Sequence, residues 1–104
     1  MALNQEYHKL WFESFVLEST SGHRDAVALR LTRDQSQNLP EEVETECDNR
    51  SLDPSDLLLE CSKDLRSSHP PGTKFLFKAK LTDREGERPF FYTNYHWKPE
   101  IVEP

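Results

Sequence analysis

Cysteines and histidines are the side chains of this 104-residue chain best suited to catalysis or metal binding, and their spacing matches no common site. Cys47 and Cys61 have no nearby cysteine or histidine pair, so they lack the spacing of a zinc site, and two cysteines are too few for a disulfide scaffold. The four histidines lie far apart in the sequence: His8, His23, His69 and His96. The sequence therefore predicts no metal, no cofactor and two free thiols.

Motifs that bind phosphate or activate a nucleophile are also missing from the sequence. The three glycines are isolated and cannot form a phosphate-binding loop, and no nucleophile elbow is present. The abundant carboxylates stand in one charged run, which is more typical of a solvated surface than of a general acid–base pair. These observations favour a non-catalytic protein.

Charge is distributed unevenly along the chain. The formal net charge is −6, which argues against a general nucleic-acid binder. Residues 39–64 carry nine acidic and two basic side chains, a local charge of −7. Residues 72–98 carry six basic and three acidic ones, a local charge of +3. The middle of the chain is acidic and the C-terminal region is mildly basic.

The clearest local pattern predicts a C-terminal β-hairpin. Apolar and polar residues alternate with a period of two over 73–82, which indicates a strand with one buried face. Residues 83–89 are polar and end in proline, as a turn does, and residues 90–97 are rich in the aromatic side chains that favour strands. The side chains of this hairpin that we expect in the core are Phe75, Phe77, Ala79, Leu81, Phe91, Tyr95 and Trp97.

The strand predicted over 90–97 has large rings on both faces, which leaves two interpretations. A strand with water on one side usually has one polar face. Either this strand is covered on both sides, or its Phe90 and Tyr92 row is exposed and binds a partner. The candidate binding residues of the hairpin are Lys74, Lys78, Lys80, Phe90, Tyr92 and His96.

Upstream, the sequence predicts a first hairpin. Residues 1–8 are expected to form a loose arm, and 10–17 a strand, with a short helix as the competing interpretation. Residues 19–23 have the composition of a turn, and 26–32 alternate as a second strand.

The middle of the chain predicts an acidic loop followed by one helix. Residues 33–52 show no usable periodicity and are expected to be a solvated loop; the alternatives are an acidic contact patch that mimics DNA, or a short helix after Pro40. Over 53–65, Asp53 is a suitable N-cap, Pro54 fits the first helical position, and the leucines with Cys61 form an apolar stripe. The helix must end before Pro70. Residues 98–104 are expected to be a tail, in which Ile101 and Val102 could add an edge strand.

These elements predict one small soluble α+β domain over residues 1–104, with order β-β-α-β-β and a four-stranded, mainly antiparallel sheet packed by one helix. No signal-peptide or membrane-length apolar run is present, so the cytoplasm is the expected compartment.

Three classes of function follow from this fold and charge pattern. The first is a protein-interaction module, such as an accessory subunit, an inhibitor or an immunity-like or antitoxin-like protein, with a protein partner or a second copy bound through the C-terminal hairpin. The second is weak single-stranded nucleic-acid binding on that hairpin. The third is an enzyme or small-ligand binder with a dispersed site.

Overall fold

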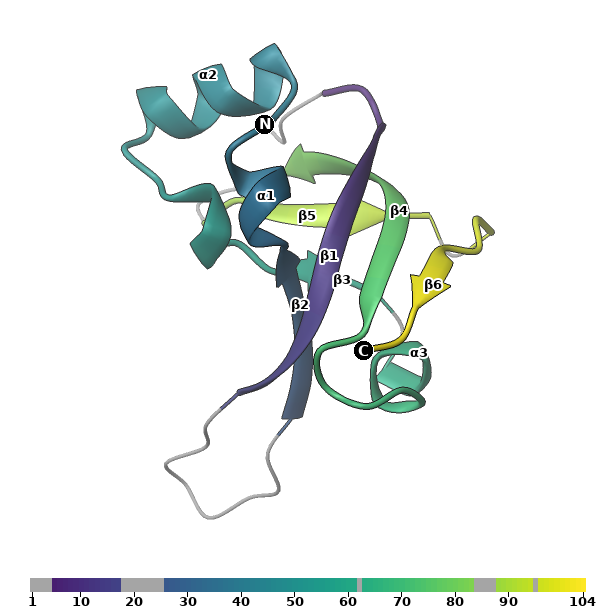
Figure 1. Cartoon of the computed structure of the whole chain (residues 1–104). Coiled ribbons are helices and arrows are strands. Elements are labelled where there is room, and N and C mark those ends of the chain that lie inside the picture. The colour runs from purple at the N-terminus through teal and green to yellow at the C-terminus, as the bar shows by residue number, and fades with distance from the viewer. Residues whose placement is uncertain (1–4, 18–25, 62, 84–87, 95) are drawn as a thin grey trace.

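The computed structural model describes residues 5–17, 26–61, 63–83, 88–94 and 96–104, and shows a small α+β domain built on a six-stranded sheet (Figure 1). The strands are β1 (His8–Leu17), β2 (Ala26–Leu31), β3 (Leu59–Glu60), β4 (Lys74–Thr82), β5 (Phe90–Thr93) and β6 (Glu100–Val102). The helical segments are α1 (Arg33–Ser36), α2 (Glu41–Asn49), the short 3₁₀ helix η1 (Pro54–Asp56) and α3 (Lys63–Ser67).

The sheet curls into a nearly closed barrel. Its strand order is β2-β1-β4-β5-β3, and β6 pairs with β4 beside β5. All pairs are antiparallel except β3 with β5, so the sheet is mixed. A bridge between Arg30 of β2 and Leu58, just before β3, brings the two ends of this order together. Closure of this kind removes exposed sheet edges along the main strand order, whereas β6 lies off that order and pairs with β4 alone.

The predicted architecture of four antiparallel strands and one helix is therefore wrong, although the α+β class holds. The two extra strands are short, at two and three residues, and each is formed by pairing with a distant strand. Such segments have almost no periodicity of their own, because long-range pairing rather than local sequence determines them.

Both predicted hairpins are present. β1 pairs with β2, and β4 pairs with β5, each in antiparallel register. The strand interpretation of residues 10–17 is thus confirmed over the helical one. β5, however, ends at Thr93, four residues before the predicted end at Trp97. The predicted turn over 19–23 and the core position of Tyr95 lie outside the described residues.

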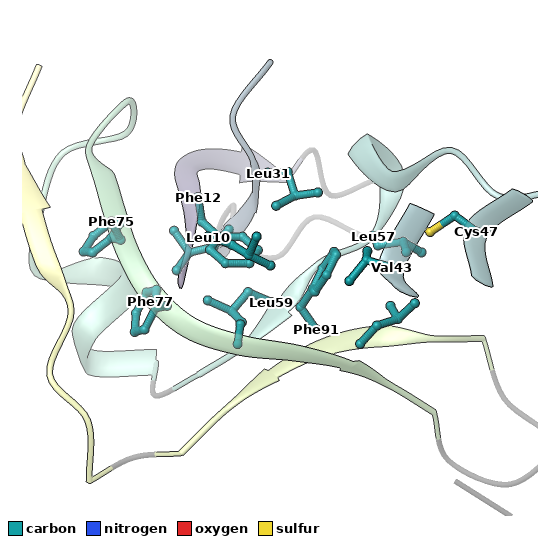
Figure 2. Close-up of a cluster of buried hydrophobic side chains, with 13 residues drawn as sticks. Leu10, Phe12, Leu31, Val43, Cys47, Leu57, Leu59, Phe75, Phe77 and Phe91 are labelled. Carbon is teal, nitrogen blue, oxygen red and sulfur yellow. The ribbon is translucent and has the colours of Figure 1, made fainter. Parts of the chain in front are cut away.

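The inside of the barrel is a single aromatic and aliphatic core (Figure 2). Alternate residues of β4 point into it, as predicted, and Phe91 joins them from β5. Phe12 of β1 meets two of these rings edge to face, with centroids 6.2 Å from Phe77 and 5.4 Å from Phe91. Burying each such ring stabilises the fold by about 1.5–3 kcal/mol, so this core dominates stability.

The helix predicted over 53–65 is wrong between its first turn and Lys63, where α3 begins. Asp53 caps as expected, since its carboxylate accepts the Ser55 backbone N–H at 3.0 Å, and Pro54 follows at the first helical position. The helical turn then stops at Asp56. Leu57 and Leu59 both point into the core, with the spacing of two that a strand gives. Pairing of β3 with β5 has therefore overridden the helical pattern.

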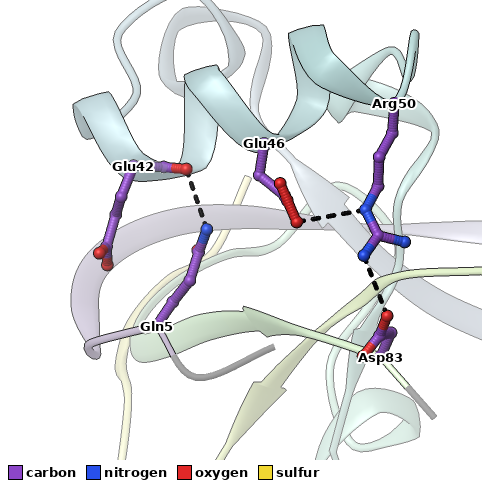
Figure 3. A network of polar contacts seen from close by, with 5 residues as sticks. All are labelled: Gln5, Glu42, Glu46, Arg50 and Asp83. Atoms are coloured by element: carbon purple, nitrogen blue, oxygen red, sulfur yellow. Dashed lines mark hydrogen bonds and ion pairs between the residues drawn. The ribbon is translucent and has the colours of Figure 1, made fainter. Parts of the chain in front are cut away.

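The acidic segment 33–52 is not a loop, as the main interpretation held, but contains α1 and α2. α2 begins directly after Pro40, which was the helical alternative, and its first-turn glutamates suit the helix dipole. Val43 and Cys47 pack from α2 onto the core. Arg50, just after α2, bonds Asp83 after β4 at 3.1 Å (Figure 3). α2 thus covers one end of the barrel (Figure 1).

The structure also refines the predictions for the two ends of the chain. The tail expected over 98–104 contains β6, which confirms the edge strand weighed for Ile101 and Val102. The arm expected over 1–8 is described from Gln5 onward, and its last residue, His8, begins β1. Among the helices of the described residues, none has the length and apolar character needed to cross a membrane.

Candidate binding site on the outer face of β4

The outer face of β4 carries the residues that alternate with its core side chains. They are Lys74, Leu76, Lys78, Lys80 and Thr82. In the registers of the flanking strands, Lys9 of β1 lies opposite Lys78, and Tyr92 of β5 lies opposite Lys80. Cross-strand partners share a face of the sheet. This defines a lysine–aromatic surface made of Tyr7, Lys9, Lys74, Leu76, Lys78, Lys80, Tyr92, Trp97 and Lys98.

Trp97 reaches this surface because the chain turns back directly after β5. The Asn94 side chain accepts the His96 backbone N–H at 2.9 Å, and the Asn94 carbonyl accepts the Trp97 N–H at 3.1 Å. Asparagine favours such turns because its side chain can bond the backbone two residues on. Trp97 is 37% exposed, so its predicted place in the core is wrong.

Two lysines lie against aromatic rings on the surface. The Lys78 ammonium is 5.3 Å from the centroid of the Trp97 ring, and the Lys80 ammonium is 5.0 Å from that of Tyr7. Tyr7 and Trp97 themselves meet edge to face, with centroids 4.7 Å apart. The two ammonium-to-ring distances fall within the range of cation–π attraction. The rings and the ammonium groups therefore hold one another in place.

Tyr7 belongs to the N-terminal segment, and Glu42 of α2 fixes that segment. The Glu42 carboxylate accepts the Glu6 backbone N–H at 3.0 Å and contacts His8 Nε2 at 2.7 Å. The Gln5 side-chain amide donates to the Glu42 carbonyl at 2.9 Å (Figure 3). Residues on both sides of Tyr7 are thus tied to the helix that covers the barrel end.

A hollow of about 320 Å³ opens beside Trp97, and we call it the Trp97 hollow. Its lining is formed by Lys9, Leu76, Lys78, His96, Trp97, Lys98 and Glu100. Three lysines against one carboxylate make it basic, and the indole and leucine give it an apolar wall. Such a hollow suits a flat ring that carries negative charge nearby.

A second hollow of about 400 Å³, the Trp11 hollow, lies further along the same face. It is lined by Trp11, Thr32, Asp34, Gln35, Asn38, Lys74 and Val102. Lys74, one of the predicted binding residues, belongs here rather than to the Trp97 hollow.

The six predicted binding residues all come from β4, β5 and the turn that follows, but they do not form one cluster. Lys78 and His96 line the Trp97 hollow, and Tyr92 lies opposite Lys80 with its ring 37% exposed. Phe90 is half-buried, opposite Thr82 at the far end of β4.

Sequence reasoning missed the other parts of the surface. Tyr7 and Lys9 lie in or beside the segment expected to be a loose arm, and Trp97 was placed in the core. The turn-forming Asn94 was the one local signal that could have moved Trp97 to the surface.

Groups suited to covalent or metal chemistry are absent from this surface. Within the described residues, no cluster of three or more histidine, cysteine or acidic side chains could hold a metal ion. Both cysteines are thiols outside any disulfide, and they lie elsewhere: Cys47 in the core and Cys61 beside it. Burial raises the pKa of Cys61 to about 11 and also raises the pKa of Cys47. Neither thiol has the lowered pKa of a reactive cysteine.

Comparison with known proteins found no matching family model, no matching curated protein and no matching solved structure. The geometry of the surface is therefore the basis for any proposal about function.

Proposed function

We propose that this protein is a non-catalytic binding module whose lysine–aromatic surface binds single-stranded nucleic acid. The observation that carries the proposal is the exposure of Tyr92 and Trp97, each 37%, among five lysines on one face of the barrel. Exposed rings stack on unpaired bases and lysines meet the phosphates, which is how single strands are bound without sequence preference.

The charge pattern sets the expected strength. Only five lysines supply phosphate contacts, and each contributes about one unit or less to the slope of log affinity against log salt. The acidic α2 lies at the end of the barrel instead of on this face (Figure 1), so it does not block the surface, but its field still repels a polyanion. Stacking adds about 1–3 kcal/mol per base. We expect micromolar affinity at low salt, largely lost at physiological salt.

The order in which the barrel strands are connected gives the nucleic-acid proposal some further support. Strands in the cyclic order β1-β2-β3-β5-β4, with β3 parallel to β5, form a barrel with the connectivity of the OB-fold, whose members often bind oligonucleotides. Those members use the face of their second and third strands, whereas the surface here lies over β1, β4 and β5. Fold alone does not define function, so the surface remains the main support.

The test is fluorescence anisotropy with a labelled single-stranded DNA or RNA oligonucleotide at two salt concentrations. Wild-type protein is compared with the double variant Tyr92→Ala, Lys78→Ala. The matched control is Arg33→Ala, which also removes one exposed charge but lines a different hollow with Asp53 and Asp56.

We expect binding at low salt that the double variant abolishes and the control retains. Absence of binding at low salt would refute the proposal. Tight binding at high salt that ignores the double substitution would place the site on another surface.

A second candidate function, protein interaction, is favoured by the edge strand β6. Its Ile101 and Val102 are 39% and 52% exposed, which places two apolar side chains on a strand at the sheet edge. Exposed edges of this kind pair with strands from other chains. A second copy of this chain is the simplest partner, with two β6 edges side by side.

Sedimentation at micromolar concentration tests this second candidate. A dimer that Val102→Lys converts to a monomer would support pairing through β6, and a monomer at all concentrations would remove the self-association form of it. Glu100→Lys is the matched control, since it changes charge on the same strand without removing an apolar contact.

A further inference from the structure

The Trp11 hollow continues the Trp97 hollow along the same face of the sheet. β1 gives Lys9 to the Trp97 hollow and the next outward residue, Trp11, to the other. β4 in the same way gives Leu76 to one and Lys74 to the other, and Trp11 lies opposite Leu76 in the β1–β4 register. An extended single-stranded oligonucleotide whose first base entered the Trp97 hollow would therefore place its next bases in the Trp11 hollow.

The two hollows differ in charge. The Trp97 hollow presents three lysines, whereas the Trp11 hollow presents one lysine, Lys74, and one carboxylate, Asp34. Trp11 and Val102 supply its apolar wall. The hollow thus combines a ring for stacking, one cation for a phosphate and one carboxylate.

Most other polar groups of the Trp11 hollow are already engaged. The Gln35 side chain accepts the Trp11 backbone N–H at 3.0 Å and donates to the Asn38 carbonyl at 2.7 Å. Thr32 Oγ1 accepts the Gln35 N–H at 3.2 Å. These bonds fix the wall of the hollow and leave few of its groups available for a ligand.

The Asp34 carboxylate is the main available acceptor. Asp34 is exposed, and its contacts within the described part of the chain run through its backbone carbonyl, which accepts from Gln37 and Asn38. An ionised carboxylate accepts hydrogen bonds and cannot donate them. A ligand group that meets Asp34 must therefore bring its own donor.

We propose that the Trp11 hollow selects bases that carry an exocyclic amino group, namely cytosine, adenine and guanine, over thymine and uracil. The base lies against the Trp11 ring and donates an amino N–H to the Asp34 carboxylate, as cytosine N4 does to acidic side chains in other complexes. Thymine and uracil have no amino group, and their one ring donor, N3–H, lies between two carbonyl oxygens that the carboxylate repels. This selectivity rests on the nucleic-acid binding proposed above.

The experiment compares the affinities of ten-residue oligo-dC, oligo-dA and oligo-dT at low salt by anisotropy competition. One good base contact discriminates by about tenfold or more, so wild-type protein is expected to prefer oligo-dC and oligo-dA over oligo-dT by about this factor. The variant Asp34→Asn is nearly isosteric, but its amide both donates and accepts. It should bind all three oligonucleotides with similar affinity.

The matched control is Asp48→Asn, which removes the same charge from the exposed surface of α2. It should raise all three affinities slightly, by reduced repulsion, and keep the preference. Equal wild-type affinity for oligo-dT and oligo-dC would overturn the selectivity and leave the proposed function standing. So would a preference that survives in Asp34→Asn. No binding of any oligonucleotide would refute the proposed function itself, and the selectivity with it.

Discussion

The two faces of β4 differ in burial and composition: one packs in the core and the other faces solvent. Its inward residues Phe75, Phe77, Ala79 and Leu81 are at most 2% exposed, whereas its outward residues include three lysines and no ring of their own. Packing dictates the inward residues, because a buried site tolerates only apolar groups of fitting size. Outward positions face no such constraint. The lysines there can therefore face water, and they are available for the binding proposed above.

The largest expected effect on stability comes from a substitution on the inward face of β4. Phe77 stacks on Phe75 at 5.9 Å and meets Phe12 edge to face. Phe77→Ala should lower the free energy of unfolding by about 3–5 kcal/mol, through lost burial and the cavity left behind. Urea denaturation followed by circular dichroism measures it. A loss below about 1 kcal/mol would mean that the inner face does not dominate stability.

An intermediate effect is expected where the covering helix α2 fixes the outer surface. Glu42→Ala removes the acceptor of the Glu6 N–H and the partner of His8. We expect a loss of about 1 kcal/mol, together with weaker oligonucleotide binding as Tyr7 loses its position. Glu44→Ala, exposed on the same helix, is the control and should leave both quantities unchanged. If both variants had the same stability and the same oligonucleotide affinity, the contacts of Glu42 with the N-terminal segment would not be what positions Tyr7 on the binding surface.

A small effect on stability with a clear effect on binding is expected from the outer face. Lys78 is exposed, so Lys78→Ala should change the free energy of unfolding by less than about 0.5 kcal/mol. The same change should lower the salt slope of oligonucleotide binding by about one unit. A variant that loses stability while it keeps the wild-type slope would reverse the roles assigned to the two faces.

The last prediction concerns the pH dependence of stability. Burial raises the pKa of Cys61 from its ordinary 9.0 to about 11, so the protonated thiol is favoured in the fold. Between these two values the unfolded chain binds fewer protons than the folded one, and stability should fall as pH rises through this window. Thermal unfolding from pH 8 to pH 11 checks it. Cys61→Ser should flatten that part of the profile, and an unchanged profile would contradict the assignment.

The sequence predicts the inner face well because burial leaves a periodic signal. The alternation over 73–82 and the strand at 10–17 both have long inward rows, which local pattern reading detects. The consecutive leucines 57–59 fit a helix stripe as well as a strand. Only the partner strand β5 decides between them, and a single sequence does not show that pairing.

Only the part of the candidate surface that lies on β4 and β5 could be predicted from local sequence pattern. Its β4 lysines and Tyr92 follow from strand alternation. Tyr7 joins them through the contacts of its neighbours with Glu42, more than thirty residues away, and Trp97 joins them through the turn at Asn94. Long-range contacts assemble the surface, so its membership emerges only when the barrel is formed.

The most direct test of the central claim is an NMR titration of isotope-labelled protein with a single-stranded oligonucleotide at low salt. The account predicts that amide shifts concentrate on Lys74–Lys80, on Lys9 and on Tyr92, and that the Trp97 indole N–H shifts with them, while α2 stays unchanged. Shifts that map to another face, or no shifts at all, would contradict the claim that the outer face of β4 binds nucleic acid.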